Sequence, residues 1–516
     1  MQKRRAAKLY LIGIDAAPLW LLKENINSYR LGGFKKMALG NGVITNLEST
    51  MPPMTGPSWP SIYTGFRPGE HGVPEFLKMQ PNYTKDVVFY NANIKRPFWD
   101  TLAEHGFKSL VITPPMVVKP SDEENVDMMT GFPLPPKFSS KKVHDAAAKH
   151  GFAGEPDIEH KIKSGEISME KATKLYVESI ERRSKMAKDL ISGDGYDLAF
   201  VCFTEEDRAQ HFSLNLPNWK DYVMPLYESI SDFMLWIEER AEREHATVML
   251  VSDHGAQPIK MKFLLNGWLI NSGYAVLKEE LSKQIDETSA IGSMKYSMRE
   301  GILKVINRSG SRKLIYDKLP KSLKGLSKAA LSKLLVGASR DDYIRIHDFD
   351  YDMGRTKAFA SVANTIVCTI FINDSRFEHG IVSKSEKPRL KKQIMGDLLK
   401  LKDERGHRLI VNVFDADDYY EGTKLFIAPD IMAEAKEGYL LDVFGYMKSG
   451  KLFTEPEPAK RGDHIRNGIF GILDYKNSHD YAALERKKLY VYNIEPTILK
   501  YFGIGPDNDK RYKSIV

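Results

Sequence analysis

The sequence predicts an α/β fold in which helices cover a mostly parallel sheet and a cap subdomain is inserted into the chain. Three apolar runs have the length of buried strands, and each leads directly into polar residues: KLYLIGID, YDLAFVCFTEED and ATVMLVSDHG. Continuous apolar runs of this kind are typical of parallel strands that are covered on both faces. Helical patterns over residues 163–191 and 226–243 alternate with these strands, and such alternation favours an α/β core.

Acidic and histidine side chains stand at or just beyond the ends of the predicted strands. Asp15 ends the first strand, Asp207 follows the second, and Asp253 and His254 follow the third. In open α/β sheets, ligands bind at the carboxyl ends of the strands. We therefore expect these side chains to meet in one site.

The pattern changes in the second half of the chain. Short basic helical segments occupy residues 281–336, and a strand-rich stretch follows with AFASVANTIVCTIFIND, a helix over 387–402, and HRLIVNVF. The strand NGIFGILD and a helix over 494–501 then return to the core pattern. This order predicts a catalytic core in two parts, residues 1–280 and 431–516, with residues 281–430 as an inserted cap.

The net charge of +7 is concentrated in one region of the 516 residues. Residues 282–340 contain 13 Lys or Arg and four Asp or Glu, so this stretch is more basic than the whole chain. It is interpreted either as a solvated helical insertion or as a surface for anionic substrates or lipid headgroups at a membrane. Its aromatic residues are only Tyr296 and Tyr316, so we expect no specific nucleic-acid binding.

The two cysteines and the N-terminal segment bear on the cellular location. Cys202 and Cys368 each lie in an apolar run without metal-ligand spacing, so we interpret them as core residues. Low cysteine use fits a reducing compartment, and we expect a cytoplasmic protein, with peripheral membrane contact as an alternative.

The N-terminal segment MQKRRAAKLYLIGIDAAPLWLL is similar to a signal peptide, but Asp15 interrupts its apolar part, which favours a first strand. No run of about 18 apolar residues predicts a membrane span.

The segment MTGPSWPSIYTGFRPGEHG offers a hydroxyl nucleophile. Pro57 fits at a helix start, because the first helical N–H groups have no intrahelical partner. Thr55 would then precede the helix, where free N–H groups, including that of Gly56, can hold an anionic oxygen. A divalent ion bound to the Thr55 hydroxyl would lower its pKa. The alternative is an ordinary helix cap, and the rival hydroxyls Ser58 and Ser61 fall inside the helix.

A second segment, TEEDRAQHFS, offers a carboxylate and an imidazole with helical spacing. Asp207 and His211 are four residues apart, so a helix places both on one face, where they can bind one ion. Glu205 and Glu206 are less well placed, and we expect them to support the site or to face solvent. The alternative is a solvated acidic loop with an incidental histidine.

Two further segments add candidate ligands. Asp253 and His254 follow the strand ATVMLV, and both reach one ion only if the strand has ended, because adjacent strand residues point in opposite directions. A surface loop is the alternative. His464 lies in GDHIRNGIF between Gly462 and an apolar strand, where a lone histidine is commonly structural, and Asp463 is interpreted as a supporting residue.

In this order the segments resemble motifs of the alkaline phosphatase superfamily, and most closely those of the type I phosphodiesterase/nucleotide pyrophosphatase family. The motifs that carry the resemblance are LIGIDAAP, TGPSWPSIYTGFRPGEHG, DRAQH, SDHG and GDHIRNGIF. The similarity extends to RPFWDTLAEHGFKSLVIT, NGWLINSGYAVL and YNIEPTILKYFGI, and is weakest over residues 281–340. It implies an alkaline-phosphatase-like sheet and two divalent metal ions.

The resemblance also implies how the ligands divide between the ions. One ion would be bound by Asp15, Thr55, Asp253 and His254, and the other by Asp207, His211 and His464. Zinc is the metal implied, with manganese or iron as alternatives, because the ligands mix imidazole nitrogen and carboxylate oxygen. Gly56 and Ser58 would contact the substrate. Ser58 replaces an asparagine that is usual three residues after the nucleophile, and this departure argues against a nucleotide substrate.

We therefore expect a hydrolase of anionic phosphoesters, with phosphodiesters as the first expectation, that acts through a phosphothreonine intermediate on Thr55. The alternatives on the same scaffold are a phosphoryl or substituted-phosphoryl transferase, a phosphomonoesterase and a sulfatase, although the sequence contains no CxPxR-like sulfatase signature. A binding module without turnover is the non-enzymatic alternative. The presence of all seven expected ligands argues against it. The sequence does not indicate an oligomeric state.

Overall fold

The computed structural model describes most of the chain. The described residues are 7–193, 195–279, 343–347, 350–420, 423–447, 449–457, 460–476, 481–505 and 512–516. The basic stretch at residues 282–340 lies outside them, so its interpretation as a lipid or substrate surface stays a prediction. None of the described helices combines the length and the hydropathy of a membrane span.

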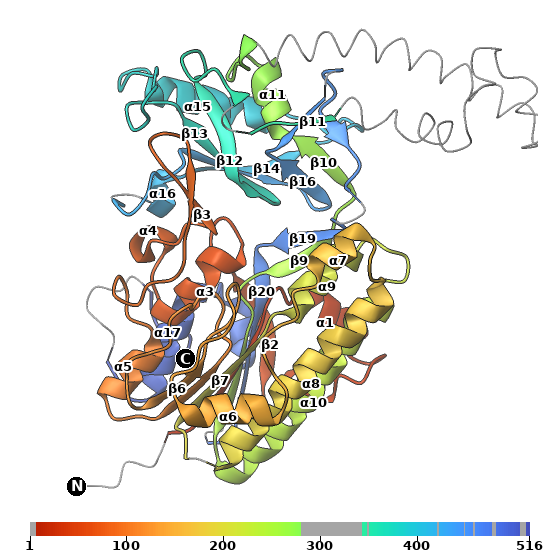
Figure 1. Ribbon diagram of the computed structural model, residues 1–516, viewed down its shortest axis with the longest axis vertical. Helices are drawn as coiled ribbons and strands as arrows, with labels where there is room; N and C mark the ends of the chain where they lie inside the picture. The colour runs from red at the N-terminus through yellow and green to blue at the C-terminus, as the bar shows by residue number, and fades with distance from the viewer. Residues whose placement is uncertain are drawn as a thin grey trace, which may run out of the picture.

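A seven-stranded sheet forms the centre of the larger body (Figure 1), in the order β2-β20-β8-β1-β7-β5-β6. Its strands are β1 (Leu9–Ile14), β2 (Val43–Glu48), β5 (Ser109–Ile112), β6 (Val126–Met129), β7 (Leu198–Phe203), β8 (Thr247–Val251) and β20 (Asn467–Asp474). The strands β8, β1, β7, β5 and β6 are mutually parallel, whereas β20 runs antiparallel to both of its neighbours, β8 and β2. The three strands predicted from apolar runs are β1, β7 and β8, and all three are buried along their whole length.

Helices cover both faces of this sheet and form two hydrophobic clusters with it. Alternate residues of β1 face opposite sides: Tyr10 and Ile12 belong to one cluster, and Leu9 and Leu11 belong to the other. The first face is covered by α2 (Gly32–Leu39), α6 (Lys141–Lys149), α8 (Met169–Gly193) and α10 (Lys220–Glu244). The second face is covered by α3 (Thr55–Thr64), α5 (Phe98–Glu104) and α17 (Ile494–Tyr501).

The helical predictions need two corrections. The pattern over residues 163–191 is two helices, because α7 (Glu159–Ser164) ends at Gly165, which has a φ of +76°, before α8 begins. The helix predicted over 226–243 begins earlier, at Lys220, and contains Pro225. A proline six residues into a helix leaves one backbone carbonyl of the first turns without its usual donor.

A smaller body contains the described residues of the predicted cap (Figure 1). Its largest sheet is antiparallel, in the order β12-β13-β15-β14, with β12 (Ala358–Asn364), β13 (Val367–Ile372), β14 (Ile410–Asp415) and β15 (Ile431–Ala435). The other elements of this body are β10 (Met261–Leu264), α11 (Leu265–Asn271), β11 (Tyr343–Arg345), α15 (Lys387–Leu399), α16 (Asp417–Tyr420), β16 (Tyr439–Asp442), β17 (Gly445–Met447) and β18 (Phe453–Thr454). A third hydrophobic cluster holds this body together, and it includes Phe263 and Leu441. Residues on both sides of the boundaries predicted near 280 and 430 therefore pack in one cluster.

Short elements link the two bodies. A pair of antiparallel strands, β9 (Gly255–Pro258) and β19 (Gly462–Ile465), lies between them in Figure 1. A hairpin of β3 (Leu77–Met79) and β4 (Lys85–Val87) extends from the larger body, and Tyr83 at its turn stacks on Phe377 of the cap with ring centroids 5.1 Å apart. The remaining helices of the larger body are α1 (Leu19–Asn25), α4 (Pro68–His71) and α9 (Glu205–Ser213).

Candidate metal centre

The end of β1 delivers Asp15 in a fixed orientation. Ala16, the next residue, has a φ of +58°, a left-handed conformation that costs about 1 kcal/mol or more in a residue other than glycine. The turn is held by the Ala16 N–H, which donates to Asp253 Oδ1 at 3.2 Å, and by Gln210 Nε2, which donates to the Ala16 carbonyl at 2.9 Å. Trp59 Nε1 donates to Asp15 Oδ2 at 3.0 Å, so Oδ1 of the same carboxylate is left for the site.

Thr55 is the first residue of α3, two residues earlier than the predicted helix start. Pro60 consequently lies inside the helix, where no Pro60 N–H exists to bond the Gly56 carbonyl. The N–H groups of Thr55 and Gly56 fall in the first turn, which has no intrahelical acceptors for them. The close approach of Glu75 favours glycine at position 56, since a Cβ there would lie 3.1 Å from the carbonyl carbon of Glu75, a tighter contact than is usual. The helix start therefore presents a hydroxyl beside backbone donors, as predicted.

One group of ligand atoms surrounds the Thr55 hydroxyl. Thr55 Oγ1 lies 3.3 Å from Asp15 Oδ1 and 3.4 Å from His254 Nε2. His254 Nε2 lies 3.5 Å from Asp15 Oδ1 and 3.2 Å from Asp253 Oδ2. Asp253 and His254 follow Ser252, the first residue after β8, where the chain has left the sheet, so both side chains reach the same point. All four residues are buried.

A second group lies where α9 meets β19. His211 Nε2 and His464 Nε2 lie 3.3 Å and 3.2 Å from Asp207 Oδ1, and 3.0 Å from each other. Asp207 and His211 share one face of α9 as their spacing predicts, and His464 comes from β19. The imidazole rings of His464 and His254 have centroids 4.0 Å apart, so the two groups are neighbours. The structure thus brings all seven predicted ligands together.

Backbone carbonyls set the tautomer of each histidine. His211 Nδ1 lies 2.9 Å from the Gly462 carbonyl, His464 Nδ1 lies 3.1 Å from the Pro53 carbonyl, and His254 Nδ1 lies 3.1 Å from the Gly255 carbonyl. A carbonyl oxygen only accepts hydrogen bonds, so Nδ1 carries the proton and donates in all three rings. In the neutral ring each Nε2 then presents a lone pair, which is the state required of a metal ligand.

The electrostatics of the two groups favour bound cations. Burial and the Asp207 carboxylate raise the pKa of Asp15 well above its ordinary value, and burial and Asp15 do the same to the pKa of Asp253. Burial acts to raise the pKa of Asp207 too, but His211 and His464 hold it well below its ordinary value. Burial and the neighbouring His464 lower the pKa of His254, which keeps its ring neutral.

The geometry of the residues fits divalent ions. Among the described residues, no hydrogen-bond donor satisfies the buried atoms Asp207 Oδ1 and Asp253 Oδ2. In a tetrahedral shell with metal–ligand distances of about 2.0–2.2 Å, neighbouring ligand atoms lie roughly 3.3–3.6 Å apart. The separations within the two groups are 3.0–3.5 Å, close to this range. Carboxylate, imidazole and hydroxyl groups at these positions could hold divalent ions.

The sequence reasoning missed Trp59 and Gln210, whereas Glu205 and Asp463 are among the residues that it predicts as possible supports of the site. Glu205, expected to support the site or face solvent, is fully buried and pairs with the buried guanidinium of Arg183 at 2.9 Å. Asp463 is buried, accepts the His464 N–H at 2.7 Å and lies near the ligand atoms of both His211 and His464. One feature of the sequence could have indicated Trp59 and Gln210 as site residues: each lies within four positions of a predicted ligand.

The predicted substrate contact by Ser58 stays a prediction. Ser58 is fully buried, and its Oγ lies 2.7 Å from both Ser49 Oγ and Thr50 Oγ1. Thr50 Oγ1 also donates to the Pro52 carbonyl at 2.8 Å. This chain of hydroxyl groups braces the segment that leads to Thr55, so the described partners of the Ser58 hydroxyl belong to the protein itself.

Comparisons with known proteins show the family and the fold of this chain. The sequence profile described as "Type I phosphodiesterase / nucleotide pyrophosphatase" matches residues 9–364. No curated protein matches the sequence. Among solved structures, phosphonoacetate hydrolase from Sinorhizobium meliloti 1021 in complex with phosphonoacetate gives a TM-score of 0.54 at 12% identity, covering 95% of this chain and 94% of that chain. Murine ectonucleotide pyrophosphatase/phosphodiesterase 5 gives 0.46 at 12% identity, covering 97% of each chain. The predicted alkaline-phosphatase-like fold is confirmed.

Proposed function

This chain belongs to the type I phosphodiesterase/nucleotide pyrophosphatase family and is a hydrolase of anionic phosphoesters, and from this premise we propose that it is a metal-dependent phosphodiesterase with Thr55 as its nucleophile. The observation that supports the proposal is the position of Thr55 Oγ1, which lies 3.3 Å from Asp15 Oδ1 and 3.4 Å from His254 Nε2 at the start of α3. A threonine that only capped the helix would not need buried metal-ligand atoms on two sides.

The proposed ligands divide as the two groups of side chains do. One ion would be held by Asp15, Thr55, Asp253 and His254, and the other by Asp207, His211 and His464. Zinc is the proposed metal, with manganese and iron as alternatives. When bound, such ions lower the pKa of a coordinated hydroxyl or water and neutralise charge on phosphate oxygens.

In the proposed reaction, Thr55 forms the covalent intermediate. Its deprotonated Oγ attacks phosphorus, a bond forms between Oγ and phosphorus, and the bond from phosphorus to the leaving alcohol oxygen breaks. The N–H groups of Thr55 and Gly56 donate to a non-bridging phosphate oxygen, where negative charge gathers in the transition state. Water then attacks the phosphothreonine, releases the phosphate product and regenerates the Thr55 hydroxyl.

A substrate panel with two variants at Thr55 tests the proposal. Wild-type protein supplied with zinc, manganese or iron is assayed with bis(p-nitrophenyl) phosphate, p-nitrophenyl phosphate and p-nitrophenyl sulfate. We expect the diester to be the best substrate, and Thr55→Ala to lose at least about a thousandfold in kcat, because the nucleophile is gone. Thr55→Ser keeps a hydroxyl and should retain measurable turnover.

The control is Thr64→Ala, which removes a buried threonine hydroxyl at the other end of the same helix, where it donates to the Pro60 carbonyl. This variant should turn over the diester within about threefold of wild type. Turnover near the wild-type rate by metal-loaded Thr55→Ala would exclude the covalent route. A preference for the monoester or the sulfate ester would reassign the substrate class.

A further inference from the structure

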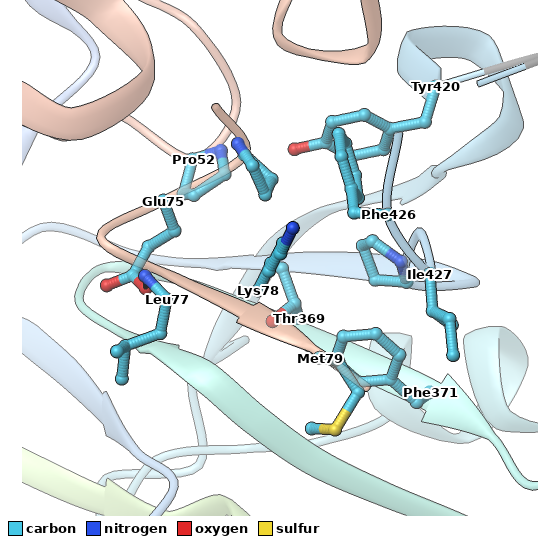
Figure 2. A pocket seen from close by; sticks show the side chains of 12 residues that line it. Pro52, Glu75, Leu77, Lys78, Met79, Thr369, Phe371, Tyr420, Phe426 and Ile427 are labelled. Carbon is cyan, nitrogen blue, oxygen red and sulfur yellow. Dashed lines mark hydrogen bonds between the residues drawn. The ribbon is translucent and has the colours of Figure 1, made fainter. Parts of the chain in front are cut away.

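A narrow recess lies between residues of the larger body and residues of the cap (Figure 2). Pro52 lines it and precedes Thr55 by three residues, which an extended chain spans in about 10 Å. Glu75 lines it as well, and its backbone packs against Gly56. From the cap, β13 and the segment after α16 close the other side. The recess is therefore connected to the start of α3 in two ways: through the short chain segment from Pro52 to Thr55, and through the contact between Glu75 and Gly56.

The recess contains one cation. Among the described residues that line it, Lys78 is the only lysine or arginine. Figure 2 shows its amino group among Pro52, Tyr420 and Phe426, whereas the carboxyl group of Glu75 lies to one side. Lys78 is half-buried, and no carboxylate of the described residues forms an ion pair with it. Asp86, its cross-strand neighbour in the hairpin, accepts a hydrogen bond from Gln80 Nε2 at 2.6 Å instead.

The other polar groups of the recess do not offset this charge. Glu75 Oε2 accepts the Leu77 N–H at 2.8 Å, and burial raises the pKa of Glu75 to about 8, which leaves its carboxyl group mostly neutral at pH 7. The Tyr420 hydroxyl donates to the Met51 carbonyl at 2.7 Å, and the Thr369 hydroxyl donates to the Ser361 carbonyl at 2.6 Å. A partly desolvated ammonium without a counter-charge is unfavourable, and an anion supplied by a ligand would relieve this cost.

We propose that Lys78 is a specificity residue, which binds an anionic oxygen group that the substrate carries beyond its reacting phosphate. The inference rests on the proposed function, because it requires that the phosphate of the substrate lies at Thr55. The recess has a cavity volume of about 20 Å³, room for one water-sized group. An oxygen of a carboxylate or of a second phosphate fits this volume, whereas a nucleobase does not.

Equilibrium binding of phosphonates tests the inference without turnover. Three series with two to six methylene groups are compared on zinc-loaded protein by calorimetry: plain alkyl phosphonates, ω-carboxyalkyl phosphonates and ω-phosphonoalkyl phosphonates. At the best chain length, the added anion should tighten binding by about tenfold, the size of one charge-assisted hydrogen bond. The carboxylate and phosphonate arms then distinguish the two kinds of anionic group.

Variants of the hairpin assign the effect to Lys78. Lys78→Met should reduce the gain from the added anion to less than about twofold, and Lys78→Arg should keep most of it, because arginine retains the positive charge that methionine lacks. Lys85→Met is the matched control: it removes a lysine from the other strand of the same hairpin that does not line the recess. It should leave the gain unchanged.

Two results would overturn the inference. One is equal binding of all three series at every chain length by the wild-type protein. The other is a preference for the anionic series that survives in Lys78→Met. Failure of the proposed function would give a different result. Plain alkyl phosphonates would bind, but bis(p-nitrophenyl) phosphate would not be hydrolysed. If no phosphonate binds at all, the inference about Lys78 fails, whereas the proposed function is still decided by whether bis(p-nitrophenyl) phosphate is hydrolysed.

Discussion

At the scale of single residues, the three histidines of the candidate centre owe the orientation of their rings to hydrogen bonds that no motif reveals. His211, His254 and His464 direct Nε2 towards the site because Nδ1 of each ring meets a backbone carbonyl. The sequence identifies the imidazoles through their spacing from carboxylates. It does not identify the carbonyl that fixes each tautomer, because any residue provides a carbonyl and only the folded chain brings the right one near.

The two glutamates beside Asp207 illustrate the same limit. The sequence predicts that Glu205 and Glu206 either support the site or face solvent, and both are fully buried, which excludes the second alternative. Glu205 pairs with Arg183, which α8 provides. Charged residues are almost never buried without a partner, and a partner 22 positions away in sequence is not visible in a local pattern.

Glu238 should make stability depend on pH. It is fully buried in α10, and burial raises its pKa to about 8. In the unfolded chain the carboxyl group ionises near pH 4.3. Between about pH 4.5 and 8 the unfolded state therefore releases a proton that the folded state keeps, so stability falls as pH rises through this window. We expect Glu238→Gln, which cannot ionise, to gain thermal stability over wild type as pH increases from 5 to 8.

Thermal unfolding at pH 5, 6, 7 and 8 measures this difference. The control is Glu239→Gln, because Glu239 is the next residue of the same helix and is exposed. The shift in Tm between Glu239→Gln and wild type should not change with pH. A constant difference between Glu238→Gln and wild type across these values would contradict the prediction.

At the scale of elements, the centre depends on how closely β19 approaches α9. A Cβ at Gly462 would lie 2.4 Å from the Gln210 carbonyl oxygen, so only glycine allows the two elements to pack at this distance. The same contact region contains the bond from His211 Nδ1 to the Gly462 carbonyl, at 2.9 Å, and the bond from the Arg461 N–H to the His211 carbonyl, at 2.6 Å. The sequence placed Gly462 beside His464 but gave no sign that α9 is its neighbour.

Gly462→Ala should therefore separate His211 from His464. We expect the second ion to be lost, so that metal content falls from about two ions per chain to about one, while the group around Thr55 is kept. Elemental analysis of protein after dialysis against dilute zinc measures the content. Gly396→Ala is the control, since Gly396 lies in α15 and a Cβ there would meet no atom within 4 Å. Unchanged metal content in Gly462→Ala would show that the close approach is not required.

The start of α3 was predicted to within two residues, and the error has a physical cause. A proline is most easily accommodated in the first turn, so the prediction began the helix near Pro57. The helix instead begins at Thr55 and continues through Pro60. Tertiary packing explains the difference, because every residue of α3 is buried, and burial of side chains such as Trp59 outweighs the loss of one backbone hydrogen bond.

At the scale of the whole molecule, the ligands connect segments that are far apart in sequence. Asp15 ends β1, and His464 lies 449 positions later in β19, beyond the cap. In metal-free protein, the buried carboxylates of Asp15, Asp207 and Asp253 repel one another. Ions that bind only the folded state would remove this repulsion and stabilise the whole chain.

Chelation should lower the thermal stability of the protein. At ion concentrations about a hundredfold above the dissociation constant, binding contributes about 2.7 kcal/mol, so we expect EDTA to lower Tm by several degrees and zinc to restore it. The matched control is the double variant Asp207→Asn and Asp253→Asn, which lacks one ligand carboxylate in each group and should respond less. An unchanged Tm after verified removal of metal would contradict the prediction.

The sequence by itself determined the α/β class, the three central strands and the identity of all seven candidate ligands. It could do so because buried strands need continuous apolar runs, and because metal-ligand side chains at their ends are unusual enough to notice. Only the tertiary structure decided which carboxylate oxygen faces which imidazole nitrogen, that Ser58 bonds to other hydroxyls, and that Lys78 lines a recess near Thr55 with no carboxylate partner among the described residues. These features arise where segments remote in sequence come within a few ångströms, and local patterns carry no information about such contacts.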